Sequence, residues 1–250
     1  MIVPQLVAHR GYASRFPENT LESLEAALEA GACFVEFDVQ LTRDGCPVLL
    51  HDFDFSRTGG RDDLVCELSL QQVLAIEVGQ PEIFGNRFAG AGVPTLAGAL
   101  RLVASWDRAR AFVEIKPESL EHFGLERVAE RVLADFARTD TKPVLISSVG
   151  EFLVHARRSG HAEIGLVLGD WSRDSQKALE ELQPQYVFCN LQRIPAQGKL
   201  WPGAWKWVVY EVVSPRLALE LAERGADLIE TMAIGEMLAD PTLGSRSCRD

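Results

Sequence analysis

Short apolar runs alternate with amphipathic stretches along the whole chain, and this alternation restricts the fold more than any other feature. The runs are rich in Val, Ile and Leu and predict eight β-strands, at residues 5–9, 34–40, 112–116, 144–148, 164–168, 186–190, 207–212 and 227–231. Periodic apolar positions predict helices between most of them, at residues 21–30, 96–105, 125–138, 151–159, 175–182 and 216–224. Strands joined by helices form parallel sheets, and eight of them favour closure into a (β/α)8 TIM barrel.

One connection predicts a hairpin instead of a helix. The dipeptide Asp44-Gly45 separates the second strand from a short apolar run at residues 47–51, and this pair is typical of a tight turn. If these two residues form the whole loop, Asp38 lies opposite His51. Glu36 then shares their face, because side chains alternate along a strand. Four apolar residues are expected on the other face, namely Phe37, Val39, Val48 and Leu50.

The stretch after this hairpin does not continue the barrel pattern. Residues 53–94 contain clusters of Gly, Asp and Arg and only one helical run, at 70–78, so they predict a small insertion after the second strand. A helix between residues 194 and 204 is expected to be short or missing, because this stretch contains two prolines and two glycines. The 250 residues are then one barrel domain, 1–250, which is the ordinary size of this fold.

Charge and apolar content exclude several classes of function. The net charge of −11 argues against a nucleic-acid partner, because binding to a phosphate backbone needs a basic surface. No apolar run approaches the roughly 20 residues of a membrane span, and the N-terminus has no basic, apolar leader pattern. The five cysteines are odd in number and form no CxxC pair, so neither a disulfide framework nor a zinc site is expected. Buried thiols and a cytoplasmic location follow from this interpretation.

Two carboxylates of the predicted hairpin suggest a metal site. Glu36 and Asp38 lie two residues apart on one strand face, and paired carboxylates are natural ligands for a hard cation such as Ca²⁺ or Mg²⁺. Taken alone, this polar face is also compatible with an ordinary hairpin surface that faces solvent.

Two further strand ends carry charged residues. Glu114 and Lys116 share a face near the end of the third barrel strand, and active sites of such barrels lie at the carboxyl ends of the strands. His9 and Arg10 end the first strand and precede Gly11, which allows a close turn of the backbone. A single charge at a strand end is usually structural, but three strand ends with such residues predict one shared site.

The combined strand ends supply two histidines, three carboxylates and two cations. The histidines could act as general acid and base, while a metal held by the carboxylates polarises a phosphoryl oxygen. Arg10 and Lys116 would offset charge in the transition state. The sequence has no GxSxG motif, no Walker loop and no GxGxxG after a strand, so phosphodiester cleavage fits better than acyl or hydride transfer.

These residues resemble the signature of the glycerophosphodiester phosphodiesterase family. The matching motifs are His9-Arg10-Gly11, Pro17-Glu18-Asn19-Thr20, Glu36-Phe37-Asp38-Val39-Gln40-Leu41-Thr42, Asp44-Gly45, His51-Asp52, Arg57-Thr58, Pro94-Thr95-Leu96 and Glu114-Ile115-Lys116. Weaker matches follow at Ser147-Ser148, Val209-Tyr210 and Gly225-Ala226-Asp227-Leu228-Ile229, so the resemblance extends over nearly the whole chain.

The resemblance implies a role for each of the residues at the strand ends. It implies Ca²⁺ or Mg²⁺ at Glu36, Asp38 and Glu114. It also implies that His9 and His51 form the acid–base pair, that Arg10 and Lys116 contact phosphate, and that the Tyr210 ring lies against substrate. Glu18 is expected to brace Arg10, and Asn19 to cap the first helix.

The implied substrates are glycerophosphodiesters, which would be cleaved to sn-glycerol 3-phosphate and an alcohol. Either water or the glycerol 2-hydroxyl could attack phosphorus. The chain departs from the family pattern at Val149, at Glu211-Val212-Val213 and at Thr231-Met232. These positions are expected on the side of the leaving group, so the alcohol is the least constrained part of the prediction.

Two other functions compete with this hypothesis. A lysophospholipase D or phosphoinositide phospholipase would act on intact lipids and would need an apolar rim. The insertion offers four candidate residues for such a rim, Phe53, Phe55, Phe84 and Phe88, although charges interrupt them. A binding module without catalysis is disfavoured, since all the expected catalytic residues are present.

Overall fold

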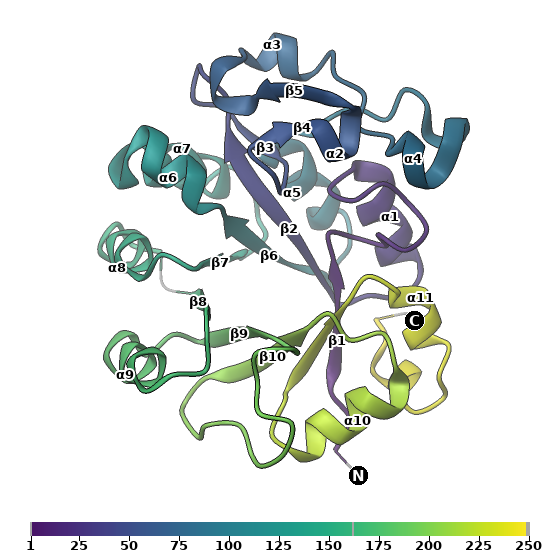
Figure 1. Ribbon diagram of the computed structural model, residues 1–250, viewed down its shortest axis with the longest axis vertical. Helices are drawn as coiled ribbons and strands as arrows, with labels where there is room; N and C mark the ends of the chain where they lie inside the picture. The colour runs from purple at the N-terminus through teal and green to yellow at the C-terminus, as the bar shows by residue number, and fades with distance from the viewer. Residues whose placement is uncertain (1, 162, 249–250) are drawn as a thin grey trace.

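The computed structural model describes residues 2–161 and 163–248, and its centre is a closed barrel of eight parallel strands (Figure 1). The strands are β1 (Gln5–His9), β2 (Phe34–Leu41), β6 (Arg110–Ile115), β7 (Val144–Ser147), β8 (Ile164–Val167), β9 (Tyr186–Asn190), β10 (Lys206–Tyr210) and β11 (Leu228–Thr231). Each strand pairs with the next in this order, and pairing of β1 with both β2 and β11 closes the ring. The predicted (β/α)8 barrel is confirmed.

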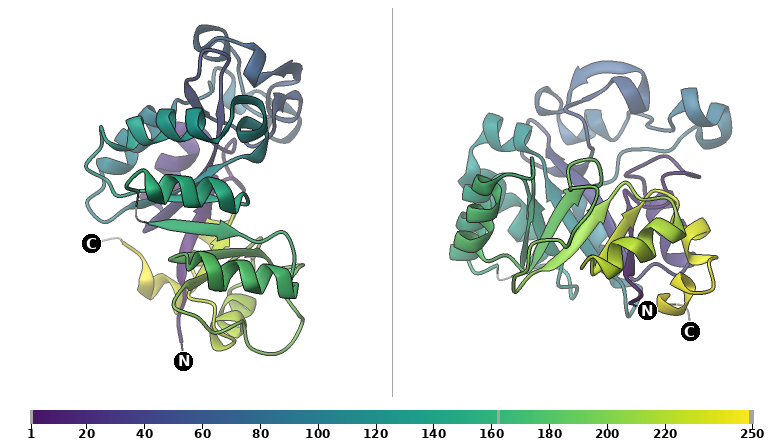
Figure 2. Two further views of the ribbon diagram at one scale, coloured as in Figure 1. Left: turned by 90° about the vertical axis from the view of Figure 1, so that its left-hand side faces the viewer. Right: turned by 60° about the horizontal axis from the view of Figure 1, so that its bottom comes forward.

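Helices surround the barrel on the outside (Figures 1 and 2). The six predicted ones are present as α1 (Leu21–Glu29), α5 (Leu96–Ala104), α7 (Leu125–Phe136), α8 (Gly150–Arg158), α9 (Arg173–Leu182) and α10 (Pro215–Glu223). Two short helices, α6 (Pro117–Phe123) and α11 (Ile234–Leu238), were not predicted. No helix forms between β9 and β10, as the prolines and glycines of that stretch predict.

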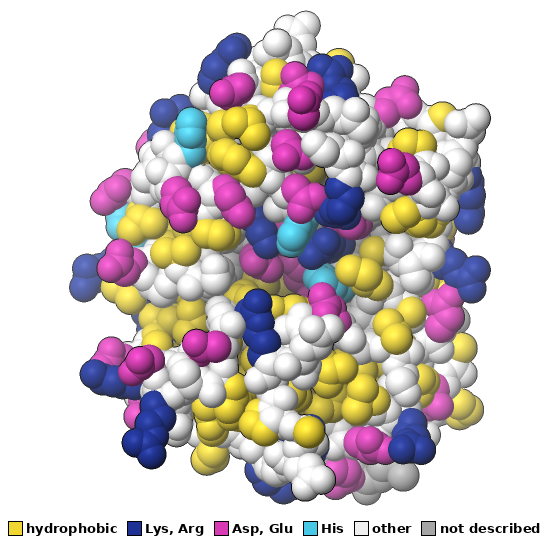
Figure 3. All heavy atoms as spheres, in the orientation of Figure 1, with side chains coloured by type: hydrophobic (Ala, Val, Ile, Leu, Met, Phe, Trp, Pro, Cys, Tyr) yellow, Lys and Arg dark blue, Asp and Glu magenta, His cyan; other side chains and the backbone are white. Residues whose placement is uncertain are grey.

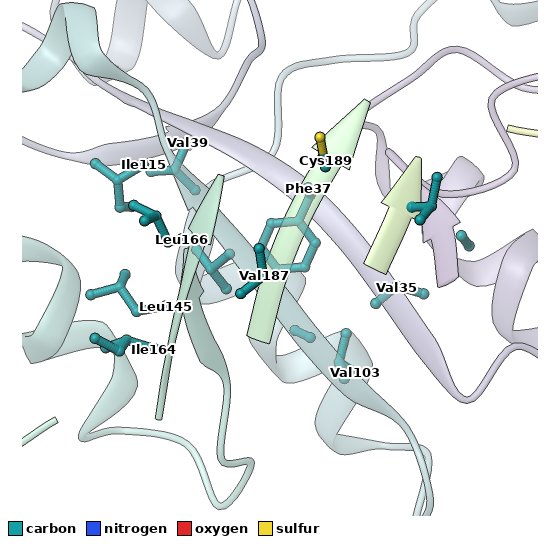
Figure 4. Close-up of a cluster of buried hydrophobic side chains, with 14 of the residues drawn as sticks. Val35, Phe37, Val39, Val103, Ile115, Leu145, Ile164, Leu166, Val187 and Cys189 are labelled. Atoms are coloured by element: carbon teal, nitrogen blue, oxygen red, sulfur yellow. The ribbon is translucent and has the colours of Figure 1, made fainter. Parts of the chain in front are cut away.

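Strand side chains alternate between two apolar layers. Outward-facing residues such as Val35, Phe37 and Val39 pack under the helices (Figure 4), and all three are fully buried. Inward-facing residues such as Phe34 and Phe112 form a second cluster inside the barrel. Full burial of one large apolar side chain contributes roughly 1.5–3 kcal/mol. This apolar filling ends toward the carboxyl ends of the strands, where inward positions become polar.

The hairpin after β2 differs from the predicted register by one residue. β3 (Pro47–Leu49) pairs antiparallel with β2, and Val39 lies opposite Leu49, so the loop has three residues, 43–45. Gly45 has a φ of 75°, whereas a two-residue turn of this type would need positive φ at Asp44 as well. The predicted pairing of Asp38 with His51 was therefore wrong. Asp38 lies opposite Leu50, whose amide donates to its carbonyl at 3.1 Å.

Because the register is shifted by one residue, the predicted faces of the second hairpin strand were also wrong. Leu49 packs with Val39 under the helices. Val48 and Leu50 belong instead to a separate apolar cluster, completed by Phe55, Val65, Val73, Ile76, Val78 and Val93. This cluster is the core of the insertion that follows β3.

The insertion lies at one end of the molecule, beyond β3 (Figure 1). Its elements are β4 (Asp54–Phe55), α2 (Ser56–Gly59), β5 (Arg61–Leu64), α3 (Leu70–Val73) and α4 (Pro81–Phe84). The helix predicted at residues 70–78 was too long, because Glu77 forms a bridge with Gly92 and Val78 donates to the carbonyl of Ala91.

The prediction for the cysteines was also wrong in part. Cys33 and Cys248 form a disulfide with an S–S distance of 2.17 Å, although 215 residues separate them. Sequence spacing does not reveal this pair, because only the closed ring brings the end of the chain beside the residue that precedes β2. Cys46, Cys66 and Cys189 are free thiols. Within the described residues, every helix is too short or too polar to cross a membrane.

Candidate active site

The predicted polar residues meet at a cavity of about 230 Å³ at the carboxyl ends of the strands. Histidines, carboxylates and cations gather at the centre of this face (Figure 3). The lining residues are His9, Arg10, His51, Glu114, Lys116, Val167, Phe188, Asn190, Arg193, Tyr210, Glu211 and Glu230. A larger cavity of about 1010 Å³, which includes Arg110 and His161, contains none of the predicted residues.

Three carboxylates form a candidate cation site beside this cavity. Oxygen atoms of Glu36, Asp38 and Glu114 lie within 4.8 Å of one another, and Asp38 is directly opposite Glu114 in the register of β2 and β6. Burial and neighbouring carboxylates raise the pKa of both Glu36 and Glu114. The Oε1 atom of Glu36 is buried without a hydrogen-bond partner among the described residues. The group therefore fits an oxygen-only cation site.

Arg10 is held by its backbone as well as by its charge. It has a φ of 55°, and its amide donates to Glu36 Oε2 at 3.1 Å. The guanidinium contacts Asp38 Oδ2 at 3.1 Å and donates to Glu18 Oε1 at 2.9 Å. A Cβ at Gly11 would lie 2.6 Å from the Ser23 carbonyl carbon, so only glycine allows this turn. The predicted brace between Glu18 and Arg10 is present.

Asp38 has partners on every side. Asn19 Nδ2 donates to its Oδ2 at 2.9 Å, and the Asp38 amide donates to Asn19 Oδ1 at 3.1 Å. Lys116 lies 3.4 Å from Oδ1 and donates to Glu114 at 3.1 Å. Burial opposes ionisation, but Arg10 and Lys116 lower the pKa of Asp38 well below its usual range. The predicted cap role of Asn19 was wrong, since the preceding turn places Asn19 on Asp38.

The first helix is capped by the next residue instead. Thr20 precedes α1 and its hydroxyl accepts from the Ser23 amide at 3.2 Å, which satisfies one of the free amides of the first turn. Asn19 has a φ of 57°, a conformation that asparagine tolerates better than most residues.

His51 belongs to a chain of charges that joins the insertion to the barrel. Its Nδ1 lies 2.6 Å from Asp52 Oδ1, and Asp52 accepts from Arg57 at 2.7 Å. Arg57 also donates to both oxygens of Glu18, at 2.6 and 2.8 Å. The insertion thus fixes His51 through the same carboxylate that holds Arg10.

His9 is enclosed more completely than His51. It is 6% exposed, and its ring centroid lies 6.1 Å from that of Tyr210. Burial, and then the charge of Arg10, lower the pKa of His9 to about 3. Burial raises the pKa of Tyr210 to about 12, so its phenol stays protonated. A neutral imidazole at this position can accept a proton.

Glu230 lines the cavity and was not predicted as a site residue. It is 2% exposed, and burial and the neighbouring carboxylates raise its pKa well above the usual range. The available signal was the alternation along the last strand, where Leu228 faces inward and Glu230 occupies the next inward position. Glu230 therefore occupies the same kind of position as Glu36, which also faces inward from a barrel strand.

Known proteins share this sequence pattern and fold. The profile of the Glycerophosphoryl diester phosphodiesterase family matches residues 9–198. A glycerophosphodiester phosphodiesterase from Caldanaerobacter subterraneus subsp. tengcongensis is 31% identical over 164 residues, 65% of either chain. One from Bacillus altitudinis is 28% identical over 168 residues, 66% of this chain and 67% of that protein. The chain thus aligns with about two thirds of the length of these curated relatives.

A solved structure shows the same fold. An Oleispira antarctica phosphodiesterase, in complex with the product sn-glycerol-3-phosphate, has a TM-score of 0.81 to this chain at 24% identity. The match covers 95% of this chain and 96% of that one.

Proposed function

Because this chain belongs to the glycerophosphoryl diester phosphodiesterase family, we propose that it hydrolyses glycerophosphodiesters to sn-glycerol 3-phosphate and an alcohol. One observation carries the proposal: two histidines, three cations and three carboxylates line a single cavity, and Glu36 and Asp38 lie beside the lining residue Glu114. The cavity of about 230 Å³ has room for a small phosphodiester group.

His9 and His51 form the acid–base pair in this proposal. His9 is neutral at neutral pH, since its pKa is lowered to about 3, and it accepts the proton of the attacking hydroxyl. The attacking group is either water or the glycerol 2-hydroxyl. His51 donates a proton to the departing alkoxide, and the contact of its Nδ1 with Asp52 leaves Nε2 for this transfer.

The remaining residues hold the phosphate. Glu36, Asp38 and Glu114 would bind one Ca²⁺ or Mg²⁺ ion, which supplies charge stabilisation at a phosphoryl oxygen when bound. Arg10 and Lys116 bind the remaining phosphate oxygens, since both line the cavity and are fixed by carboxylates behind them. The Tyr210 ring packs against the substrate.

We propose water-soluble, deacylated substrates rather than lipids. Of the four phenylalanines that could form an apolar rim, Phe55 is fully buried in the core of the insertion. Phe84 and Phe88 pack against each other at 5.3 Å, and Arg87 lies 4.7 Å from the Phe88 ring. Phe53 packs against the same core, and Phe84 and Phe88 are half-buried. Their contacts within the protein favour a structural role over an acyl-chain rim.

One assay tests the activity and the substrate class together. Glycerol 3-phosphate release from glycerophosphocholine should require Ca²⁺ or Mg²⁺, and excess chelator should stop it. The value of kcat/KM should be far lower for lysophosphatidylcholine below its micellar concentration. Full activity of the metal-free protein would refute the cation site, and faster cleavage of the lysolipid would favour the lipid enzyme.

We also propose that residues 1–250 form one barrel domain, with the insertion at about 53–94. A cytoplasmic location stays a prediction, and the Cys33–Cys248 pair tests it, because a reducing compartment would keep these thiols free. Thiol labelling of the protein in intact cells would distinguish the two states.

A further inference from the structure

A second group of ligands lies beside the proposed oxygen-only cation site. One ring nitrogen of His9 and one oxygen from each of Glu36 and Glu230 lie within 4.8 Å of one another. The three residues are 6%, 2% and 2% exposed. The proposed reaction uses His9 and Glu36 but gives no role to Glu230, a carboxylate inside the barrel.

Each of these three side chains has a buried polar atom without a hydrogen-bond partner. His9 Nδ1, Glu36 Oε1 and Glu230 Oε1 are buried and have no hydrogen-bond partner among the described residues. Buried polar groups are normally hydrogen-bonded, and buried carboxylates are normally paired with a cation. The nearby Arg10 gives its amide to the other oxygen of Glu36 and directs its guanidinium at Asp38. The free atoms therefore indicate a ligand rather than an internal partner.

We propose that His9, Glu36 and Glu230 form a second cation site, which binds Zn²⁺ in preference to Ca²⁺ or Mg²⁺. Imidazole nitrogen is a common zinc ligand, whereas the two harder cations are bound through oxygen. Three protein ligands with a cavity in front also match a zinc site with an open fourth position.

The spacing of the ligand atoms is compatible with zinc. His9 Nε2 lies 4.0 Å from Glu36 Oε2, too far for a hydrogen bond between them. The atoms without a partner are the other nitrogen of His9 and the other oxygen of Glu36, so each side chain has a second atom that could bind the ion. Zinc bonds of about 2.0–2.2 Å place two ligand atoms of one ion within about 4.4 Å of each other. The observed spacing of 4.8 Å or less therefore requires only small side-chain movements. Glu36 has two oxygens and can contribute to both cation sites.

Zinc at this site should inhibit hydrolysis, a consequence that rests on the proposed function. A His9 nitrogen that is bound to zinc cannot accept a proton from the attacking hydroxyl. Activity in Mg²⁺ or Ca²⁺ should thus fall as the second site fills. Binding itself is measured without substrate, so failure of the activity and failure of the site can be told apart.

The test is a zinc titration of the intact protein in excess Mg²⁺, which fills the oxygen-only site. Calorimetry or equilibrium dialysis should find one Zn²⁺ per chain for the wild type. Glu230→Gln should weaken this binding at least tenfold, because it replaces one of three ligands with a neutral amide. Glu211→Gln is the matched control, since Glu211 lines the same cavity but is exposed and accepts from Asn190 at 2.8 Å.

A second variant separates the two sites. Glu114→Gln should weaken Ca²⁺ and Mg²⁺ binding but leave zinc binding in place. The proposal is overturned if the wild type binds no zinc in excess Mg²⁺, or if Glu230→Gln binds it as well as the wild type. It is also overturned if Glu114→Gln abolishes zinc binding while Glu230→Gln does not, since zinc would then occupy the oxygen-only site. Melting temperatures of all variants check that each is folded.

Discussion

Two buried carboxylates of the barrel rim, Asp38 and Glu230, have different surroundings. At the ends of β1, β2 and β6, the carboxylate of Asp38 is surrounded by Arg10, Lys116 and Asn19. Glu230, near the end of the neighbouring strand β11, has a buried oxygen with no partner among the described residues, as Glu36 also does. Glu211, which follows β10, has a φ of 66°, a strained conformation for a residue with a side chain.

The Asp38 carboxylate is already held by partners in the free protein, whereas the Glu230 carboxylate has an oxygen that only a ligand or a proton could satisfy. A buried carboxylate with several partners is fixed in place and ionised, which suits a metal ligand. A buried carboxylate without partners is unfavourable in the free protein and becomes favourable only when a cation or proton arrives. Substitutions of Asp38 and of Glu230 should therefore have effects of different size and, for stability, of opposite sign.

The largest effect is expected at Asp38. Asp38→Asn removes a cation ligand and leaves Arg10 and Lys116 without their shared partner. Loss of several kcal/mol of charge stabilisation should lower kcat by about 10³-fold or more. Breaking a buried ion pair should also lower the free energy of unfolding by about 3–5 kcal/mol.

The matched control for Asp38 is Glu211, which follows β10, three strands away around the ring. Glu211→Gln makes the same change of charge at an exposed carboxylate, and its effect on turnover should be much smaller. Steady-state kinetics and thermal unfolding of both variants test this contrast. Equal losses in the two variants would show that the contrast does not hold.

The next largest effects are expected at the two histidines. His9→Ala and His51→Ala should each lower kcat by about 10²-fold or more, because general acid–base catalysis typically contributes that factor. Both variants should fold, and the fully enclosed His9 should affect stability more than His51. His155→Ala is a control on helix α8, away from the cavity. Near-normal kcat in either test variant would remove that histidine from the mechanism.

The same two carboxylates show what the sequence could predict. Around Asp38, His9-Arg10-Gly11 and Glu36-Phe37-Asp38 place several chemical groups within a few residues, so a strand pattern with a known direction assigns them to one site. The eight strands and six of the helices were predicted for the same reason, since apolar periodicity is local.

Features that depend on tertiary geometry were not predicted. Glu230 stands alone in its strand, and only the closed ring brings it beside His9. The hairpin register depended on whether Asp44 adopts positive φ, which composition does not decide. The Cys33–Cys248 disulfide joins residues that are 215 positions apart.

A smaller effect is expected at Arg57, which links the insertion to the site. Arg57→Ala removes the bonds that hold Asp52, and hence His51, in position. Loss of such an outer partner typically reduces activity by about 10- to 100-fold, and the lower end is expected because Arg57 is partly exposed. The effect should appear mainly in kcat.

Arg61 provides a control within the same insertion. Its ion pair with Asp63 is exposed and does not touch the site. Arg61→Ala should leave kcat nearly unchanged, since exposed ion pairs contribute little. Equal kinetics for the two variants would mean that the insertion does not position His51.

The smallest expected effect has the opposite sign and concerns Glu230. In the cation-free protein its pKa is raised by burial and by Glu114 and Asp38. A raised folded-state pKa gives stability that is present below the unfolded value and is lost as pH rises through the folded one. Wild-type stability in chelator should therefore decline as pH rises from about 5 to 8, and Glu230→Gln should reduce that decline.

Thermal unfolding between pH 5 and 8 measures this difference. At neutral pH, Glu230→Gln should raise the free energy of unfolding by about 1–3 kcal/mol, which corresponds to several degrees in Tm for a chain of this size. The depressed pKa of His9 acts in the opposite direction but is common to both proteins, so it largely cancels. Glu236→Gln is the control, because Glu236 accepts hydrogen bonds from Tyr12 and Arg15 and should lose stability or stay unchanged. A lower Tm for Glu230→Gln in chelator would show that Glu230 is already satisfied without a ligand, and the contrast between Asp38 and Glu230 would fail.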